Sequence, residues 1–171
     1  NNCDIYYVNK TNNGWTDIQV FNENISQNSS WESQPTVSSD GKTIIFASDR
    51  KGGFGKIDLY EINFINGKWT NPRNLGPTIN SDAHEKSPFL HTDGKTLFFS
   101  STNFPSLGGF DIFFSRKDSL GHWKKPINIG YPINSVSDDI SLFVSTDGIR
   151  AFFASNQLKG VGGWDIYSFD L

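Results

Sequence analysis

Three acidic residues recur at nearly constant spacing along the chain: Glu32, Glu85 and Asp139, which are 53 and 54 residues apart. Each one precedes a short predicted strand, so repeated units folded side by side would place the three carboxylates near one mouth of a shared channel. Carboxylates that lie close together can bind a cation or shift one another's pKa. The simpler alternative, which the regular recurrence favours, is that each acid accepts hydrogen bonds from the backbone of the adjacent unit.

A second set of carboxylates opens each Asp-Ile/Leu-aromatic triplet: Asp4, Asp58, Asp111 and Asp165, at intervals of 54, 53 and 54 residues. Aspartate can ligate a metal ion, but one copy in every unit favours a structural role. A carboxylate that follows a Gly-rich turn can accept backbone N–H groups and a neighbouring hydroxyl, such as those of the serines that end the preceding strand. We predict that these aspartates tie a loop to its own unit.

The remaining reactive side chains form no recognisable catalytic or metal-binding motif. His84, His91 and His122 lack ligand-like spacing, and none belongs to a nucleophile motif. The single cysteine, Cys3, excludes an internal disulfide and a cysteine-based zinc cluster. The one cluster that mixes histidine with acids, residues 82–85, is interpreted as a solvated loop. We predict no catalytic residue, no metal site, no cofactor and no enzymatic activity.

The charge balance excludes other classes of partner. The chain has 15 basic and 18 acidic residues, a formal net charge of −3, which does not suit a broad nucleic-acid-binding surface. No apolar run approaches the ~20 residues that cross a bilayer. The sequence therefore predicts no nucleic-acid partner and no membrane-spanning segment. Because it begins in the middle of the repeated pattern, we interpret it as a fragment of a longer polypeptide.

Short β-branched and aromatic runs separated by turn residues predict strands and almost no helix. Asn13-Gly14 and Asn66-Gly67 mark hairpin turns, and Asp-Gly turns begin at Asp40, Asp93 and Asp147. Each unit is expected to contain four strands, a to d. Strand a is predicted at Gln34–Ser38, Ser87–His91 and Ile140–Ser145, and strand b at Thr43–Ser48, Thr96–Ser101 and Arg150–Ser155. Strand c begins at each aspartate triplet, and strand d at Trp15, Trp69 and Trp123.

A period of about 54 residues with four short strands predicts the four-stranded antiparallel blades of an all-β propeller. Residues 1–30 would supply strands c and d of one blade, 31–83 and 84–137 two whole blades, and 138–171 strands a to c of a further blade. These are about thirteen strands, and closed propellers have about four blades or more, so the chain is expected to be part of a larger ring. The three tryptophans that open strand d are assigned to packing between blades.

The segment from Ser38 to Tyr60 reads S-x-D-G-K-x-I-x-F-x-S-x-R-x-G-G-x-x-x-x-D-L-Y and resembles the repeat of TolB-like, WD-repeat-like β-propellers. The resemblance covers essentially the whole chain. Its extension from Gly67 to Ser81, G-x-W-x-x-P-x-N-L-G-x-x-I-N-S, is similar to repeats in Bacteroidetes envelope proteins. Those proteins join the propeller to tetratricopeptide repeats and an OmpA-like peptidoglycan-binding domain, and some serve type IX secretion and gliding. The chain departs from the pattern at Leu142, where the other copies have proline.

The resemblance implies a non-catalytic protein–protein interaction scaffold in a bacterial cell envelope, periplasmic and associated with the outer membrane. Its implied partners are other envelope proteins, and peptidoglycan through a domain outside this chain. Two alternatives stay open: a propeller that binds a glycan or peptide, and the gating propeller of a peptidase whose catalytic domain lies outside the chain. The tripeptide Asp118-Ser119-Leu120 fits a pattern that is O-glycosylated in Bacteroidetes.

In a propeller the loops that join strand b to c and strand d to a share one face, which we call the b–c/d–a face. Aromatic side chains held on loops of a rigid scaffold suit protein or glycan recognition. The binding residues predicted on this face are Trp31, Phe54, His84, Phe104, Phe110 and Trp164.

Overall fold

The computed structural model describes residues 3–21, 24–157 and 159–171, so residues 1, 2, 22 and 23 of the first predicted blade and residue 158 of the fourth lie outside the described residues. Within these ranges the structure has sixteen strands and no helix, and therefore no helix that could cross a membrane. The short N-terminal strands are β1 (Tyr6–Tyr7), β2 (Lys10–Thr11), β3 (Gly14–Trp15) and β4 (Gln19–Val20). The second blade contains β5 (Glu32–Val37), β6 (Thr43–Ser48), β7 (Asp58–Ile65), β8 (Lys68–Trp69) and β9 (Arg73–Asn74). The third contains β10 (Glu85–Leu90), β11 (Thr96–Ser101), β12 (Asp111–Arg116) and β13 (Ile127–Asn128), and the fourth β14 (Asp139–Val144), β15 (Arg150–Ser155) and β16 (Asp165–Asp170).

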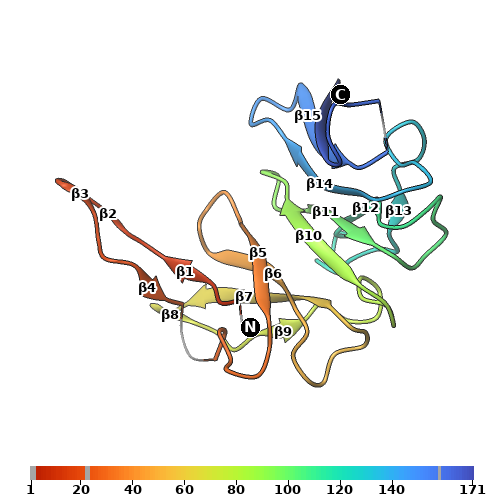
Figure 1. The fold of residues 1–171 in the computed structure, drawn as a ribbon. Coiled ribbons are helices and arrows are strands. Elements are labelled where there is room, and N and C mark those ends of the chain that lie inside the picture. The colour runs from red at the N-terminus through yellow and green to blue at the C-terminus, as the bar shows by residue number, and fades with distance from the viewer. Residues whose placement is uncertain (1–2, 22–23, 158) are drawn as a thin grey trace.

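The strands form antiparallel sheets that follow chain order, as blades of a propeller do (Figure 1). One sheet runs β5-β6-β7-β8, with β9 also paired to β7, the next runs β10-β11-β12-β13, and the last runs β14-β15-β16. At the N-terminus β1 pairs with β4, and β2 with β3. The prediction of an all-β propeller fragment is confirmed.

Strand b begins and ends at the predicted residues in all three copies. Strand c begins at its aspartate in the second, third and fourth blades, but in the first it begins at Tyr6, two residues after Asp4. Strand a was predicted one or two residues too short at its start. It begins at the acidic residue itself, because Glu32 pairs with Ser48 across the sheet, and Glu85 with Ser101 in the same register. The repeated acids are thus the first residues of the innermost strands and do not precede them.

Strand d is interrupted in the first and second blades, and strand c of the first blade is also divided into β1 and β2, which is why the structure has more strands than predicted. In the second blade the tryptophan strand β8 pairs with the far end of β7, while β9 pairs with its middle at Tyr60 and Glu61. Pro72 lies between the two pieces, and proline has no N–H to donate to a ladder. Pro126 separates Trp123, which makes only an isolated bridge to Lys117, from β13 in the third blade.

Each innermost strand contains a bulge at the same position. The register shifts in the middle of β5, β10 and β14, and a non-glycine residue there has positive φ: 54° at Gln34, 50° at Ser87 and 61° at Ser141. The bulges lie side by side, since the Ser87 N–H donates to Gln34 Oε1 (2.9 Å) and the Ser141 hydroxyl donates to Ser87 Oγ (3.2 Å). Strands β5, β10 and β14 therefore line one common axis.

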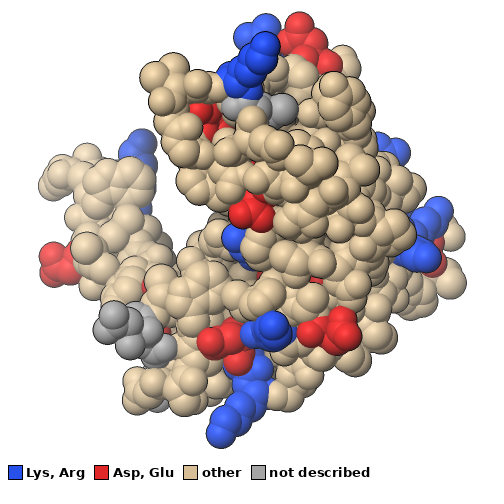
Figure 2. Space-filling view, turned by 45° about the vertical axis from the view of Figure 1, so that its right-hand side comes forward, with Lys and Arg blue, Asp and Glu red and all other residues tan. Residues whose placement is uncertain are grey.

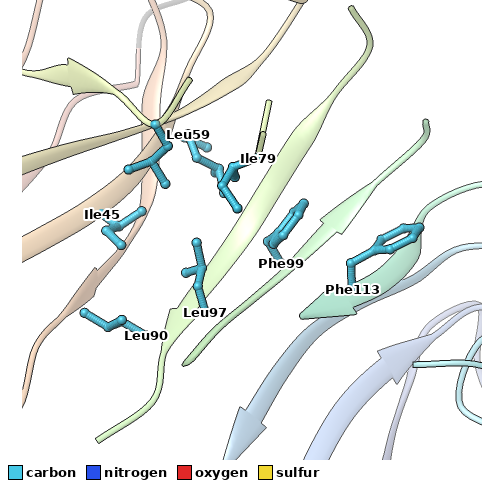
Figure 3. Close-up of a cluster of buried hydrophobic side chains, with 9 residues drawn as sticks. Ile45, Leu59, Ile79, Leu90, Leu97, Phe99 and Phe113 are labelled. Carbon is cyan, nitrogen blue, oxygen red and sulfur yellow. The ribbon is translucent and has the colours of Figure 1, made fainter. Parts of the chain in front are cut away.

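The hydrophobic cores lie between adjacent blades. In Figure 3 the side chains of Ile45 and Leu59 from the second blade lie next to Leu90 and Leu97 from the third, and Phe99 is buried in the same cluster. A second cluster joins the first blade to the second, and a third joins the third to the fourth. Burial of such apolar surface is the main force that holds successive blades together.

Two of the three repeated tryptophans, Trp69 and Trp123, pack between blades as predicted. Trp69 packs on the cluster between the first and second blades, with its ring 5.4 Å from that of Phe21, and Trp123 packs on the cluster between the second and third. Trp15 is 67% exposed, because it lies on the β2–β3 hairpin that projects from the body of the molecule (Figure 1). Trp69 and Trp123 each pack toward the preceding blade, and no described blade precedes that of Trp15, so its assignment to packing between blades stays a prediction.

Candidate functional site

The repeated aspartates accept hydrogen bonds from the backbone of the b–c loops. The buried Asp58 carboxylate accepts from the N–H groups of Phe54 (2.5 Å) and Gly55 (3.0 Å). Asp111 accepts from the Leu107 N–H at 2.7 Å, and Asp165 from the Gly162 N–H at 3.2 Å. These contacts are the predicted structural ones, with one capped turn in each of the second, third and fourth blades.

The predicted hydroxyl partner of these aspartates was wrong. The serines that end strand b donate to the acid of strand a instead: Ser48 to Glu32 (3.0 Å) and Ser101 to Glu85 (2.8 Å). The side-chain partner of Asp58 is Asn74 in strand d, whose amide donates to the carboxylate at 2.7 Å. The third blade repeats this contact between Asn128 and Asp111 at 2.8 Å.

A buried asparagine extends the same network and was missed in the sequence. The Asn134 side chain accepts from the Ile112 N–H (2.8 Å) and donates to the Ile112 carbonyl (2.8 Å) and to Asn128 Oδ1 (2.7 Å). Asn80 makes the equivalent three bonds in the second blade. The recurrence of Ile-Asn-Ser in both units was the available signal. In the first blade the N–H of Ile5 donates to the shorter Ser26 hydroxyl.

The acids Glu32, Glu85 and Asp139 are fully buried, so they are not presented at a channel mouth as a cation site would require. Glu32 accepts from the Gln27 N–H and the hydroxyls of Ser30 and Ser48, and lies 3.2 Å from the buried guanidinium of Arg50. Glu85 accepts from the Ser81 N–H (2.9 Å), and Asp139 from the Ser135 N–H (2.5 Å).

These acids fasten the preceding d–a loop to the start of strand a, and the prediction of channel-mouth acids is corrected on this point. Burial raises the pKa of Glu85, while hydrogen bonds from Ser81 and Ser101 act in the opposite direction. In the described residues, no group of three or more His, Cys, Asp or Glu side chains could hold a metal ion.

Two of the predicted binding aromatics belong to the core. Trp31 and Phe104 pack against the cluster between the second and third blades, and the Phe104 ring lies 5.4 Å from that of Phe113. Their fixed contacts with buried side chains explain why they face inward, although they lie on loops. Phe54 and Trp164 are 53% and 48% exposed and are available to a partner.

His84 and Phe110 form a half-buried pair near the innermost strands, with ring centres 6.2 Å apart. The ammonium of Lys86 lies 3.6 Å from the centre of the Phe110 ring, a cation–π contact. Burial and the positive charges of Lys56 and Lys86 lower the pKa of His84, so the imidazole is neutral at pH 7. The pair offers an aromatic surface next to a cation, without a base–nucleophile arrangement.

Sequence reasoning missed two exposed apolar residues at the position of Phe54 in other blades. Leu107 is 49% exposed and Val161 is fully exposed. Phe54 and Leu107 each donate their N–H to the motif aspartate of the same blade, so the buried carboxylate fixes the backbone that carries the exposed side chain. Aligning the b–c loops on the aspartate would have revealed the set.

Backbone hydrogen bonds join each b–c loop to the next d–a loop into one surface. The Lys56 N–H donates to the Ala83 carbonyl (2.7 Å), and the Gly109 N–H donates to the Ser137 carbonyl (2.8 Å). The loops approach so closely that a Cβ on Gly108 would lie 2.2 Å from the backbone of Val136. Figure 2 shows basic and acidic side chains interspersed on one side of the molecule, with most of that surface uncharged.

A concavity of about 210 Å³ lies on the axis between the innermost strands. Hydroxyl, amide and apolar groups line it, and none of these lining residues is titratable under ordinary conditions. The residues that line it therefore supply no general acid or base that could activate the Ser87 or Ser141 hydroxyl. Its lining residues are Gln34, Pro35, Ser87, Pro88, Phe89, Ser141, Leu142 and Phe143.

Comparison with solved structures agrees with this geometry. The chain superimposes on TolB from Acinetobacter baumannii with a TM-score of 0.60 and 15% identity, over 98% of this chain and 38% of TolB. The fold is that of a TolB-like β-propeller. The periplasmic gluconolactonase PpgL of Pseudomonas aeruginosa matches 81% of this chain and 40% of its own, with a TM-score of 0.50 and 19% identity. The chain thus spans about two fifths of either propeller. No protein-family model and no curated protein matches the sequence.

Proposed function

We propose that this chain is a non-catalytic protein–protein interaction module of a bacterial cell-envelope assembly, located in the periplasm and associated with the outer membrane. The observation that carries the proposal is the row of exposed apolar side chains on the b–c/d–a face: Phe54, Leu107 and Val161, one in each of three successive blades. Exposed apolar groups on a well-ordered scaffold mark interaction surfaces. Hydrogen bonds within the blade hold the backbone of these loops, but the packing of the blades does not require apolar side chains at these positions.

The assignment of a non-catalytic role rests on the use of the acidic groups. Glu32, Asp58 and Glu85 accept hydrogen bonds from backbone, amide or hydroxyl donors inside the blades. Asp111 and Asp139 accept them through one carboxylate oxygen, while the other oxygen is buried without a hydrogen bond. A group that serves as a fixed acceptor in a buried network is not free to exchange protons with a substrate.

The periplasmic location is supported by the resemblance of the repeat to envelope proteins and by the likeness to a propeller described as periplasmic. A link from the outer membrane to peptidoglycan, or a part in secretion or gliding, would require domains outside this chain. Fractionation of cells that express the full-length protein tests the location: we expect it with the periplasm and outer membrane, and recovery with cytosolic markers would overturn this part of the proposal.

Site-specific photo-crosslinking in the full-length protein tests the interaction surface. A photoreactive phenylalanine analogue at Phe54 or Val161 is expected to give defined crosslinks to an envelope protein. The same analogue at Ser39 or Thr146, in a–b turns on the opposite face, is the matched control. Equal crosslinking from both faces, or none from Phe54 and Val161, would contradict the proposal.

A further inference from the structure

A pocket of about 540 Å³ opens on the b–c/d–a face where the third blade meets the fourth. Its apolar walls are Leu107 from one b–c loop and Tyr131 and Val136 from the d–a loop, which are 49%, 84% and 70% exposed. Ser135, Gln157 and Lys159 supply the polar rim. This size, with mostly apolar walls and a few polar groups, is typical of ligand sites in proteins.

The equivalent junction between the second and third blades has a hydrogen bond at the two positions that line the pocket. There Asn103 donates its amide to Asp82 Oδ1 at 2.8 Å, which ties the b–c loop of one blade to the preceding d–a loop. In the next copy the repeat register places Gln157 and Val136 at these two positions. The junction between the third and fourth blades is tied at neighbouring positions instead, where the Asn156 amide donates to Asp138 Oδ2 (3.3 Å) and its oxygen accepts from the Asp138 N–H (3.0 Å). The junction therefore tolerates a polar pair, and its apolar lining between the third and fourth blades is not needed to build the blades.

The walls of the pocket are held by contacts already formed. The Leu107 N–H donates to the buried Asp111 carboxylate (2.7 Å), and the Ser135 N–H donates to the buried Asp139 carboxylate (2.5 Å). Asn134, at the base of the d–a loop, is fully buried and hydrogen-bonded on all sides of its amide. A ligand that enters would not have to order these segments, which lowers the entropic cost of binding.

We propose that this pocket binds an aromatic or long aliphatic side chain of a partner polypeptide that has an acidic residue next to it. Lys159 is the only charged residue among those that line the pocket, so it complements a carboxylate at the rim. Leu107 belongs both to the pocket and to the exposed apolar row, so the site continues the proposed interaction surface. A partner protein that covers that surface can reach the pocket. The choice of a polypeptide as the ligand therefore rests on the proposed function.

The test uses a random peptide library displayed on phage and selected against the full-length protein, with counter-selection against Val136→Asp/Gln157→Asn. This double variant copies the side chains of the hydrogen-bonded junction, and its melting temperature should match that of the parent. We expect enriched peptides to carry Phe, Tyr, Trp, Leu or Met beside Asp or Glu. In fluorescence polarisation an enriched peptide should bind the double variant with a Kd at least about tenfold higher than for the parent. A tenfold change in Kd corresponds to a loss of ~1.4 kcal/mol of binding free energy.

Two further variants separate the apolar and charged contributions. Lys159→Glu should weaken binding of the same peptide more than Lys159→Gln does, because it reverses the charge at the rim. Leu120→Asp is the matched control, since Leu120 is 79% exposed on the opposite face, and it should leave binding unchanged.

Three outcomes would overturn the inference: enriched peptides without the apolar–acidic pair, peptides that bind the double variant as tightly as the parent, or binding confined to a small acid such as 3-phenylpropionate. Crosslinking at Phe54 tests the proposed interaction surface independently of the pocket. If Phe54 still crosslinks in the double variant and no peptide is enriched by the selection, the pocket proposal is wrong but the proposed interaction surface is retained. Loss of crosslinks at every position on the face would remove the surface itself.

Discussion

Replacing Asn134 with alanine removes the amide that holds the d–a loop to strand β12. The native side chain makes three hydrogen bonds of 2.7–2.8 Å, and Asn134 and Ile112 are both fully buried. The variant leaves the N–H and the carbonyl of Ile112 without their side-chain partner. The Ile112 carbonyl keeps the Ile129 N–H (3.1 Å), and the Asn128 oxygen keeps the Gly130 N–H (2.8 Å), so each of these acceptors loses one of two donors.

The expected loss of unfolding free energy is ~3 kcal/mol. The Ile112 N–H loses its acceptor at a cost of about 1–3 kcal/mol, and the Ile112 carbonyl and the Asn128 oxygen each lose one of two donors at about 1 kcal/mol, a sum of about 3–5 kcal/mol. Asn134 borders the pocket between the third and fourth blades, so water can enter and satisfy part of the loss. This relief keeps the expected value near the lower end of the sum.

Asn134→Asp adds a pH-dependent signature. The new carboxylate can still accept from Ile112 N–H, but it faces two oxygens that previously received hydrogen bonds. Burial and these oxygens should raise its pKa in the folded state above the unfolded value of about 3.9. A raised acid pKa favours folding below the unfolded value, and that advantage is lost as pH rises through the folded value. The deficit relative to the parent should therefore be largest at neutral pH and shrink in acid.

Urea unfolding of the full-length protein, followed by tryptophan fluorescence, measures both effects. Asn103→Ala is the control, because its one hydrogen bond to Asp82 lies at the surface and should contribute less than ~0.5 kcal/mol. A loss below ~1 kcal/mol for Asn134→Ala, or a deficit for Asn134→Asp that is independent of pH, would refute the reasoning.

Three further changes test the other buried contacts. Asp111→Ala should cost ~1–3 kcal/mol in the same urea assay, since it strips two donors of their acceptor; unchanged stability with lost partner binding would reverse the structural assignment. Arg50→Ala should lower stability by ~3–5 kcal/mol, because it leaves the Glu32 carboxylate buried without its cation, and a shift under 1 kcal/mol would contradict it. For Asp93, burial opposes ionisation, but the N–H groups of residues 95 and 96 and the Thr96 hydroxyl lower its pKa to about 2. This depressed pKa gives stability that is present above the unfolded value of 3.8 and lost as pH falls through about 2; after discounting for solvent exposure, Asp93→Asn should cost about 1 kcal/mol at pH 7 and little at pH 2, as pH-dependent melting would show.

The repeat predicts the fold well because its signals are local. Strand b, at Thr43–Ser48 and in both later copies, is a continuous β-branched and aromatic run between an Asp-Gly turn and a Gly-rich loop, so its ends can be read directly. The same register locates strand c at the aspartate of the second, third and fourth blades. The break in strand d depends on Pro72 and Pro126, which interrupt a segment that its leading tryptophan marks as a single strand.

The environment of the site residues could not be predicted in the same way. Phe54 and Phe104 both lie in b–c loops, yet Phe104 contacts Phe99 and Phe113 whereas Phe54 faces solvent. Spacing along the chain gives the loop but not the direction of a side chain within it. Glu32 was assigned to a channel mouth for the same reason, because the serines and the arginine that bury it come together only when strands a and b pair.

The aspartate network links the two roles of each blade. Asp58 and Asp111 hold the loop backbone at the residue whose exposed side chain varies from Phe54 to Leu107. Because the bond is made by the main-chain N–H, the side chain at that position can change without loss of the contact. A propeller built in this way can alter its surface blade by blade while its packing stays the same. The exchange of the Asp82–Asn103 pair for Val136 and Gln157 is one such change, and both of the new side chains line the pocket between the third and fourth blades.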